Sequence, residues 1–162
     1  MEALEAIFTR RSTRSFRPDP VEQEKLDLIL TAGRQAPSGG NNQTNHFLVI
    51  RNREVLNALI RMTETAFSLM EADENTYASL RHSIAASKKG GYVFCYDAPV
   101  LIVVANRRDY GNNMSDCACA IENMMVAAQR ARPGQLLDQS TEVAQRGTGH
   151  RPIPDRARHE RR

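Results

Sequence analysis

The spacing of apolar residues predicts two helices in the first third of the chain. The first is a short amphipathic helix that ends near Thr9, and the second begins with Asp19 as its N-terminal cap. Pro20 suits the first helical position, and Glu22 follows the cap by three residues, which is the pattern of a capping box. The apolar face is formed by Leu4, Ile7 and Phe8 in the first helix, and by Leu26, Ile29, Leu30 and Gly33 in the second.

Two short apolar runs, residues 47–50 and residues 100–104, predict buried strands of one sheet. A helix that starts near Asn52 or Arg53 is expected between them. Its apolar positions are Val55, Leu56, Leu59, Ile60, Phe67 and Met70. Periodicity by itself therefore predicts a mixed domain of helices and strands.

The second half of the chain is less regular. Residues 88–91, Lys-Lys-Gly-Gly, predict a loop, and residues 92–96 are compatible with a strand or with irregular structure. A last helix is expected from about Ser115 to Gln129, with Ala118, Ile121, Met125 and Ala128 on its apolar face. Prolines and glycines interrupt every later period, so residues 146–162 are expected to be disordered.

Composition is that of one globular domain: 162 residues, of which 41% are hydrophobic and 25% charged. The net charge of +3 comes from residues 146–162, where six arginines face Asp155 and Glu160, so that residues 1–145 are close to neutral. No apolar run approaches the roughly 18 residues of a membrane span, and the first residues do not resemble a secretory signal. We therefore expect a cytoplasmic protein without a membrane partner.

The cysteines and histidines indicate no special chemistry. Cys95, Cys117 and Cys119 are odd in number and contain no C-x-x-C pair, so neither a disulfide framework nor a zinc site is expected. His46 and His82 are interpreted as structural residues rather than as acid–base groups. The sequence thus assigns no metal ligand and no catalytic side chain.

Two polar segments are candidates for ligand binding. The first, Arg-Arg-Ser-Thr-Arg at residues 10–14, carries three guanidiniums that can hold a phosphate, although a solvated basic loop has the same composition. The second, residues 36–43, contains small residues that let the backbone approach a flat ligand and amides that can read its polar edge. Its alternative is a plain turn between a helix and a strand, so neither segment decides the function by itself.

The order of these motifs is more informative than each motif alone. Arg-Arg-Ser-x-Arg-x-Phe at residues 10–16 is followed by Ala-Pro-Ser at 36–38, Asn-x-Gln at 41–43 and a His-Phe-Leu-Val-Ile strand at 46–50. This order, with Tyr-Asp-Ala-Pro at 96–99 and the helix around Asp116, resembles the nitroreductase family over roughly residues 1–129. The resemblance implies an α+β fold with a central, mostly antiparallel sheet flanked by helices. It also implies an FMN-dependent oxidoreductase that uses NADH or NADPH.

The resemblance also implies where the cofactor binds. It places the FMN phosphate, ribityl chain and pyrimidine edge on Arg10, Arg11, Ser12 and Arg14. In this family FMN lies at a homodimer interface, so the other subunit is expected to contribute Pro37, Ser38, Gly39, Asn41 and Gln43. Hydride would pass through the flavin to a nitroaromatic, quinone or similar small-molecule acceptor in a ping-pong cycle. The family usually has Pro-Trp after the glutamine, where this chain has Thr44 and Asn45.

The resemblance ends abruptly near Arg130. Relatives continue with a Leu-Gly-x-Gly-Ser-x-Trp segment, a final strand and an arm that embraces the partner, whereas this chain continues with Ala-Arg-Pro-Gly. Codons compatible with residues 130–145 yield a family-like glycine-rich segment when read one base later, which suggests a frameshift. We therefore expect a nitroreductase-like domain over residues 1–129, a non-family continuation over 130–145 and a basic tail over 146–162. Loss of the family's last strand and arm predicts weakened folding, dimerisation, FMN affinity and activity.

Three functions follow from the sequence. The leading one is an FMN-dependent NAD(P)H oxidoreductase that works as a homodimer. The second is a non-catalytic remnant of such an enzyme, which neither holds flavin nor turns over. The third, a nucleic-acid binder that uses the basic tail, ranks last because the tail lacks interleaved aromatic residues and the rest of the chain is near neutral.

Overall fold

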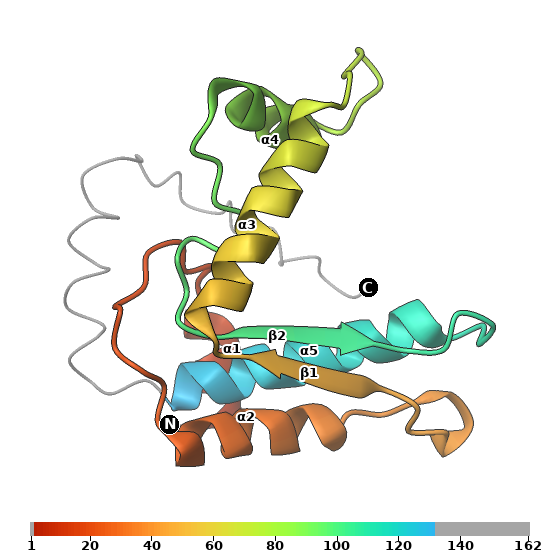
Figure 1. Cartoon of the computed structure of the whole chain (residues 1–162). Coiled ribbons are helices and arrows are strands. Elements are labelled where there is room, and N and C mark those ends of the chain that lie inside the picture. The colour runs from red at the N-terminus through yellow and green to blue at the C-terminus, as the bar shows by residue number, and fades with distance from the viewer. Residues whose placement is uncertain (1, 132–162) are drawn as a thin grey trace, which may run out of the picture. The chain divides into compact units, whose positions relative to one another are not determined.

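The structure is a computed structural model that describes residues 2–131, which fall within one compact unit ending at Ala131. Its elements in chain order, shown in Figure 1, are α1 (Ala3–Thr9), α2 (Gln23–Arg34), the 3-10 turn η1 (Gly39–Asn41), β1 (His46–Ile50), α3 (Arg53–Ser68), α4 (Ala78–Lys89), β2 (Leu101–Ala105) and α5 (Asn113–Arg130). The expected non-family continuation, apart from Arg130 and Ala131, and the expected disordered tail lie outside the described residues.

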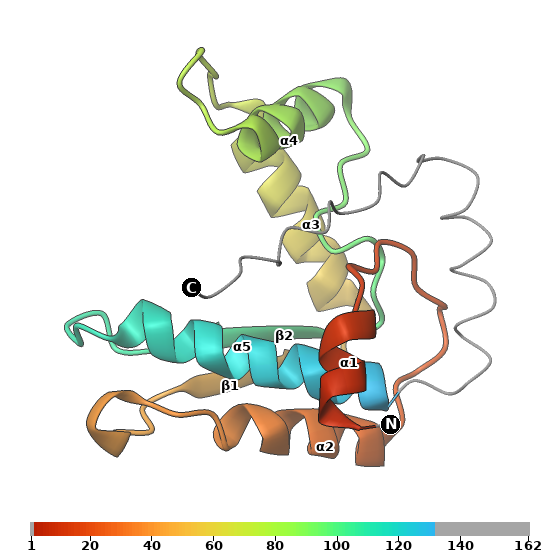
Figure 2. The same cartoon turned by 180° about the vertical axis from the view of Figure 1, so that it is seen from behind.

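The two strands form an antiparallel pair, with His46 opposite Ala105 and Ile50 opposite Leu101. α2 and α5 lie side by side and run along this pair (Figure 1, Figure 2). The expected α+β fold with antiparallel strands and flanking helices is confirmed, and both strands begin within one residue of their predicted positions. Among the helices of the described residues, none combines the length and the apolarity that a membrane crossing requires.

The expectation that both strands are fully buried is wrong for one face of the pair. Leu48 and Val103 are register partners on that face, and they are 59% and 40% exposed. The helices α2 and α5 pack on the other face, where Phe47 points toward Gly33 of α2. A short apolar run predicts that a strand is buried, but it does not predict whether one or both faces of the strand are covered. That depends on which elements pack against each face.

Leu26 and Gly33 of α2 and Ala120 and Met124 of α5 are buried, and Met124 lies against Gly33. The expected face of α2 is therefore confirmed at Leu26 and Gly33, but the expected face of α5 is wrong. Its buried stripe runs through Asp116, Ala120 and Met124, whereas Ala118, Ile121 and Met125 are exposed. Both stripes have helical spacing, so the sequence pattern alone does not choose between them.

Two details of the first helices also differ from the sequence expectation. In α1 the buried residue is Ala6, while Leu4 and Phe8 are 65% and 71% exposed. α2 begins at Gln23, with Glu22 rather than Asp19 at the N-cap and without a side-chain capping bond. The helix therefore begins three residues later than its expected first helical position, Pro20.

α3 begins at Arg53, as expected from the sequence. The Asn52 carboxamide oxygen accepts hydrogen bonds from the backbone N–H groups of Glu54 and Val55, which caps α3.

The helix α4 was not expected from the sequence. Lys88 and Lys89, expected in a loop, form the end of α4, and Gly90 follows them with φ of 85°. Residues 92–96 are irregular and contain no strand, which is one of the two expected alternatives, and the Tyr92 N–H donates to Glu64 of α3 at 2.8 Å.

Candidate functional site

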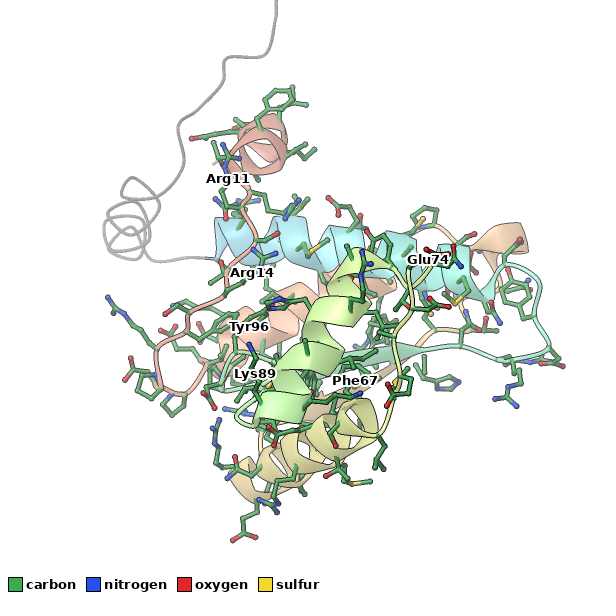
Figure 3. All side chains as sticks on the ribbon, turned by 90° about the horizontal axis from the view of Figure 1, so that it is seen from above. Arg11, Arg14, Phe67, Glu74, Lys89 and Tyr96 are labelled. Atoms are coloured by element: carbon green, nitrogen blue, oxygen red, sulfur yellow. The ribbon has the colours of Figure 1, made fainter. Side chains whose placement is uncertain are left out.

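The arginine segment follows α1 directly and leaves the helix in an extended direction. The backbone N–H of Arg10 still donates to Ala6, and the Arg11 guanidinium donates to the carbonyls of Phe8 and Arg10 at 3.1 and 2.9 Å. Ser12 and Arg14 are exposed, and Arg11 and Arg14 lie along the same irregular segment (Figure 3). Within residues 2–131 no carboxylate forms an ion pair with Arg10, Arg11 or Arg14. These cations are therefore available for an anionic group.

The start of this segment is attached to the C-terminal end of α5. The buried side chain of Gln129 donates from Nε2 to the Thr9 hydroxyl at 3.4 Å, one residue before Arg10. α1 crosses this end of α5 (Figure 2). The contact positions the first arginine relative to the α2–α5 core.

The second motif forms a tight turn between α2 and β1. Gly40, Asn41 and Gln43 have positive φ angles of 58°, 56° and 49°, the last two in residues with a side chain. The Ser38 hydroxyl accepts a hydrogen bond from the Gln43 N–H at 2.9 Å, and the Asn42 amide donates to the Gly39 carbonyl at 2.8 Å. Pro37, Asn41 and Gln43 are exposed, so the turn presents their side chains outward.

The turn is anchored to the beginning of α5 through Gly39. Its N–H donates to both carboxylate oxygens of Asp116, at 3.1 and 3.3 Å, and its carbonyl accepts from the Tyr110 hydroxyl at 2.8 Å. A Cβ atom at Gly39 would lie 2.6 Å from that hydroxyl and closer still to the Asn112 amide. Gly39 is therefore required for close packing, and its N–H is already used within the chain.

Asn45, one of the two departures from the family pattern, connects three elements behind the turn. Its amide donates to the Asp116 carbonyl at 3.1 Å, and its oxygen accepts from the Asn106 amide at 2.8 Å. Cys117 also approaches this oxygen, at 3.5 Å. The neighbouring Thr44 hydroxyl is buried without a hydrogen-bond partner in the described part of the chain.

The two motifs lie at opposite ends of α5 in one chain. The turn contacts Asp116 and the arginine segment contacts Gln129, positions separated by about 20 Å at the rise of an α-helix. The structure thus brings Pro37, Ser38, Gly39, Asn41 and Gln43 together, and separately Arg10, Arg11, Ser12 and Arg14. It does not bring the two groups together within a single protomer.

Cys117 lies beside the turn anchor on α5. Burial, and secondly the nearby carboxylate of Asp116, raise the pKa of its thiol. The thiol is therefore held in its neutral form over a wider pH range than an exposed cysteine. Within residues 2–131 no group of three or more potential ligands is arranged to hold a metal ion.

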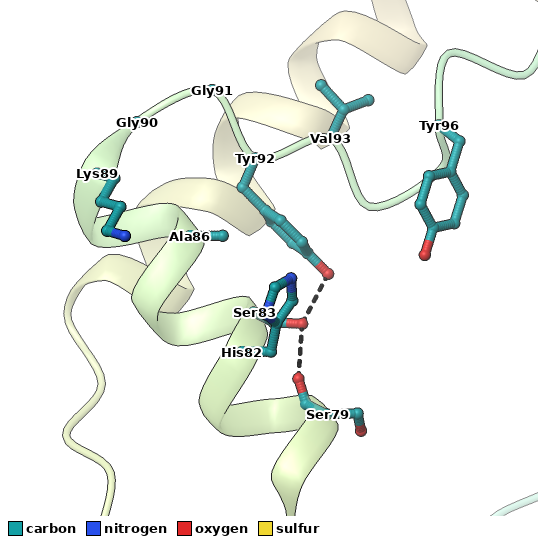
Figure 4. A pocket seen from close by; sticks show the side chains of 10 residues that line it. All are labelled: Ser79, His82, Ser83, Ala86, Lys89, Gly90, Gly91, Tyr92, Val93 and Tyr96. Carbon is teal, nitrogen blue, oxygen red and sulfur yellow. Dashed lines mark hydrogen bonds between the residues drawn. The ribbon is translucent and has the colours of Figure 1, made fainter. Parts of the chain in front are cut away.

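A separate cavity of about 700 Å³ lies between α4 and the segment that follows it. Figure 4 shows His82, Ser83 and Tyr92 along its wall, with the Ser83 and Tyr92 hydroxyls 2.9 Å apart. Tyr96, with φ of 53°, lines the other side. His46, in contrast, is exposed at the start of β1.

Sequence reasoning missed Asp116 and Tyr110 as site residues. Asp116 lies on the same stripe as Ala120 and Met124, at intervals of four residues, so a carboxylate on a buried helix face was the signal that could have identified it. Tyr110 precedes the helix in an irregular segment, and its contact with Gly39 bridges residues far apart in sequence. Nothing in the local pattern points to that contact.

Comparison with known proteins identifies relatives over most of the chain. Residues 7–136 match the family described as the nitroreductase family. An Archaeoglobus fulgidus protein named "Putative NADH dehydrogenase/NAD(P)H nitroreductase" is 33% identical over 128 residues, which are 79% of this chain and 62% of that protein.

Two solved structures extend this similarity to the fold. A Bacteroides fragilis nitroreductase with bound FMN is 35% identical with a TM-score of 0.68, over 80% of this chain and 65% of that one. A Desulfitobacterium hafniense nitroreductase with bound FMN is 30% identical with a TM-score of 0.63, over 78% and 64% of the two chains. The chain spans less than two thirds of the length of each of these relatives.

Proposed function

Since the chain belongs to the nitroreductase family, we propose that it is an FMN-dependent oxidoreductase that takes hydride from NADH or NADPH. The FMN found in two similar structures supports the cofactor, and the name of the Archaeoglobus relative supports the nicotinamide donor. The proposed acceptor is a nitroaromatic, a quinone or a similar small molecule. No side chain of the chain is proposed as an acid or a base.

The observation that carries this proposal is the set of guanidiniums after α1 that form no ion pair with a carboxylate of the described residues. Arg10, Arg11 and Arg14 have no carboxylate partner among residues 2–131, and Ser12 is exposed between them. Guanidiniums form paired, charge-assisted hydrogen bonds with phosphate oxygens, so these residues fit the phosphate end of FMN. When bound, FMN supplies hydride acceptance and electron transfer to the second substrate. The protein supplies binding and orientation.

We further propose that the site is completed by a second copy of the chain. The turn with Pro37, Ser38, Gly39, Asn41 and Gln43 lies at the far end of α5 from the arginines of its own chain. In a two-fold symmetric dimer, the turn of one chain can face the arginine segment of the other. Each of two equivalent sites would then take residues from both chains.

The test compares the affinity of the chain for FMN and for riboflavin, which lacks the phosphate. We expect FMN to bind at least about tenfold more tightly, because a charge-assisted phosphate contact contributes well over 1 kcal/mol. The double variant Arg10→Ala with Arg14→Ala should abolish this preference. Arg17→Ala removes an exposed arginine from the same connector and serves as the matched control. Equal affinity for the two flavins, or an equal effect of Arg17→Ala, would contradict the proposal.

Turnover is tested separately from binding. NADH or NADPH added without oxygen should bleach the absorbance of the bound flavin, and a quinone should restore it. A chain that neither binds FMN nor reacts with NADH or NADPH would instead be the non-catalytic remnant that the sequence also allows.

A further inference from the structure

The start of α5 carries a carboxylate that the proposed reaction does not use. Asp116 is 4% exposed, and no cation forms an ion pair with it within the described residues. Its carboxylate oxygens accept hydrogen bonds from one group there, the N–H of Gly39. Burying a carboxylate is unfavourable unless it is hydrogen-bonded, and its place in the first turn of a helix offsets only part of that penalty.

The carbonyl group of Gly39 is also held by hydrogen bonds. The Gly39 carbonyl accepts from the Tyr110 hydroxyl and from the Asn42 amide, both at 2.8 Å. Both polar groups of Gly39 are therefore directed by named side chains, and the absence of a Cβ lets Tyr110 and Asn112 approach. The next residues, Gly40 and Asn41, have left-handed backbone whose direction depends on this peptide.

We propose that Asp116, assisted by Tyr110, is a positioning residue that holds the Gly39 peptide, and thereby residues 38–43, in the conformation that receives FMN. This inference rests on the proposed function for its ligand. The Gly39 N–H does not itself contact the cofactor, because Asp116 occupies it. Asp116 acts through the turn and touches neither FMN nor substrate.

The contact can be removed in graded steps. Asp116→Leu removes the acceptor, whereas Asp116→Asn keeps one oxygen that can accept from the Gly39 N–H. Tyr110→Phe removes only the hydroxyl that donates to the Gly39 carbonyl. Asn123→Ala is the matched control, because it removes a side-chain hydrogen bond from the same helix to the Ala32 carbonyl of α2, away from the turn.

Two measurements are made on each variant: the dissociation constant of FMN, from flavin fluorescence, and amide hydrogen exchange of residues 38–43 without FMN. We expect Asp116→Leu to raise the dissociation constant about tenfold, the size of one lost buried hydrogen bond. Asp116→Asn should raise it less than about threefold, and Asn123→Ala should leave it within about twofold. Exchange in the turn should accelerate in the same order.

The two measurements, FMN affinity and hydrogen exchange, distinguish a failure of this inference from a failure of the proposed function. If the unmodified chain does not bind FMN, the proposed function is wrong, and the exchange measured without FMN still decides whether Asp116 holds the turn. Unchanged exchange at Gly39 in Asp116→Leu would overturn the inference even if FMN binds. If that variant does not fold, Tyr110→Phe decides: it should accelerate exchange in the turn, and a rate equal to that of the unmodified chain would overturn the inference.

Discussion

At the scale of single residues, Gly39 has a different role from the one its sequence context indicates. Small residues in a turn indicate that backbone amides approach a flat ligand. In the structure the Gly39 N–H donates to Asp116, and the missing side chain makes room for Tyr110 and Asn112. The glycine therefore serves the packing of its own chain, while Pro37, Asn41 and Gln43 remain exposed.

Cys117 offers a test of the environment around the same anchor. Burial and the Asp116 carboxylate raise the pKa of the Cys117 thiol, so at a given pH less of it is thiolate, the reactive form. We expect iodoacetamide to modify the exposed Cys119 well before Cys117 at pH 8, with the Cys117 rate still rising at higher pH. Asp116→Asn removes the second cause and should accelerate the modification of Cys117.

Peptide mass spectrometry over time measures both rates in one sample. The unfolded chain is the control, because there the two thiols lose their different surroundings and should react at similar rates. Equal rates in the folded protein would show that Cys117 is not held beside Asp116 as described.

At the scale of elements, the contact between α2 and α5 depends on Gly33. A Cβ atom there would lie 2.7 Å from Sδ and 2.9 Å from Cγ of Met124, and 3.0 Å from Phe47. Overpacking costs about 1–3 kcal/mol, while alanine is favoured over glycine in a helix by about 1 kcal/mol. We therefore expect Gly33→Ala to lower the free energy of unfolding by about 1 kcal/mol.

A double-mutant cycle with Met124→Ala measures this contact by urea unfolding. Met124→Ala alone should destabilise by about 2–5 kcal/mol, and Gly33→Ala should then become neutral or stabilising because the clashing atoms are gone. Gly111→Ala is the control, since no atom lies within 4 Å of its added Cβ. Additive effects at positions 33 and 124 would contradict the close approach of the two helices.

The elements also show where local pattern stops being informative. α3 and both strands are predictable because their apolar spacing and the Asn52 cap are local signals. α4 has few apolar positions and fully buries only Ile84 and Ser87, so its helical period is weak. The buried stripe of α5 was assigned wrongly because small and apolar residues occur around most of that helix, and only its contact with α2 selects Ala120 and Met124.

At the scale of the whole molecule, the proposed site requires two chains, and this can be tested by complementation. One variant combines Arg10→Ala with Arg14→Ala, and the other combines Asn41→Ala with Gln43→Ala. Each alone should bind FMN at least about tenfold more weakly than the unmodified chain. After the two are mixed under exchange conditions, half of the dimers are mixed and each contains one intact site, so about a quarter of the original binding should return.

Flavin titration and analytical ultracentrifugation of the same mixture provide the measurement. Mixing the unmodified chain with itself under the same conditions is the control for losses during exchange. No recovery of binding in a mixture that contains dimers would contradict a site shared between chains. The expected weakening of folding and dimerisation by the departure near Arg130 stays a prediction, because residues after 131 lie outside the described part of the chain.

The sequence by itself determined the family, the approximate positions of four helices and two strands, and two candidate ligand-binding motifs. These features depend on residue order and on spacing along one element, which a linear pattern records. The sequence also identified Asn45 as a departure from the family pattern, but it did not show what Asn45 contacts.

The tertiary structure decided which faces are buried, that α4 exists, and that the arginine segment and the turn lie at opposite ends of α5. It also decided that Asp116 and Tyr110 hold Gly39, across separations of 77 and 71 residues. Such contacts depend on how distant elements pack, and a hydrogen bond between residues so far apart leaves no periodic trace in the sequence. The position of the proposed cofactor turn against α5 therefore depends on the fold, while Ser38 and Asn42 hold the turn itself by local hydrogen bonds.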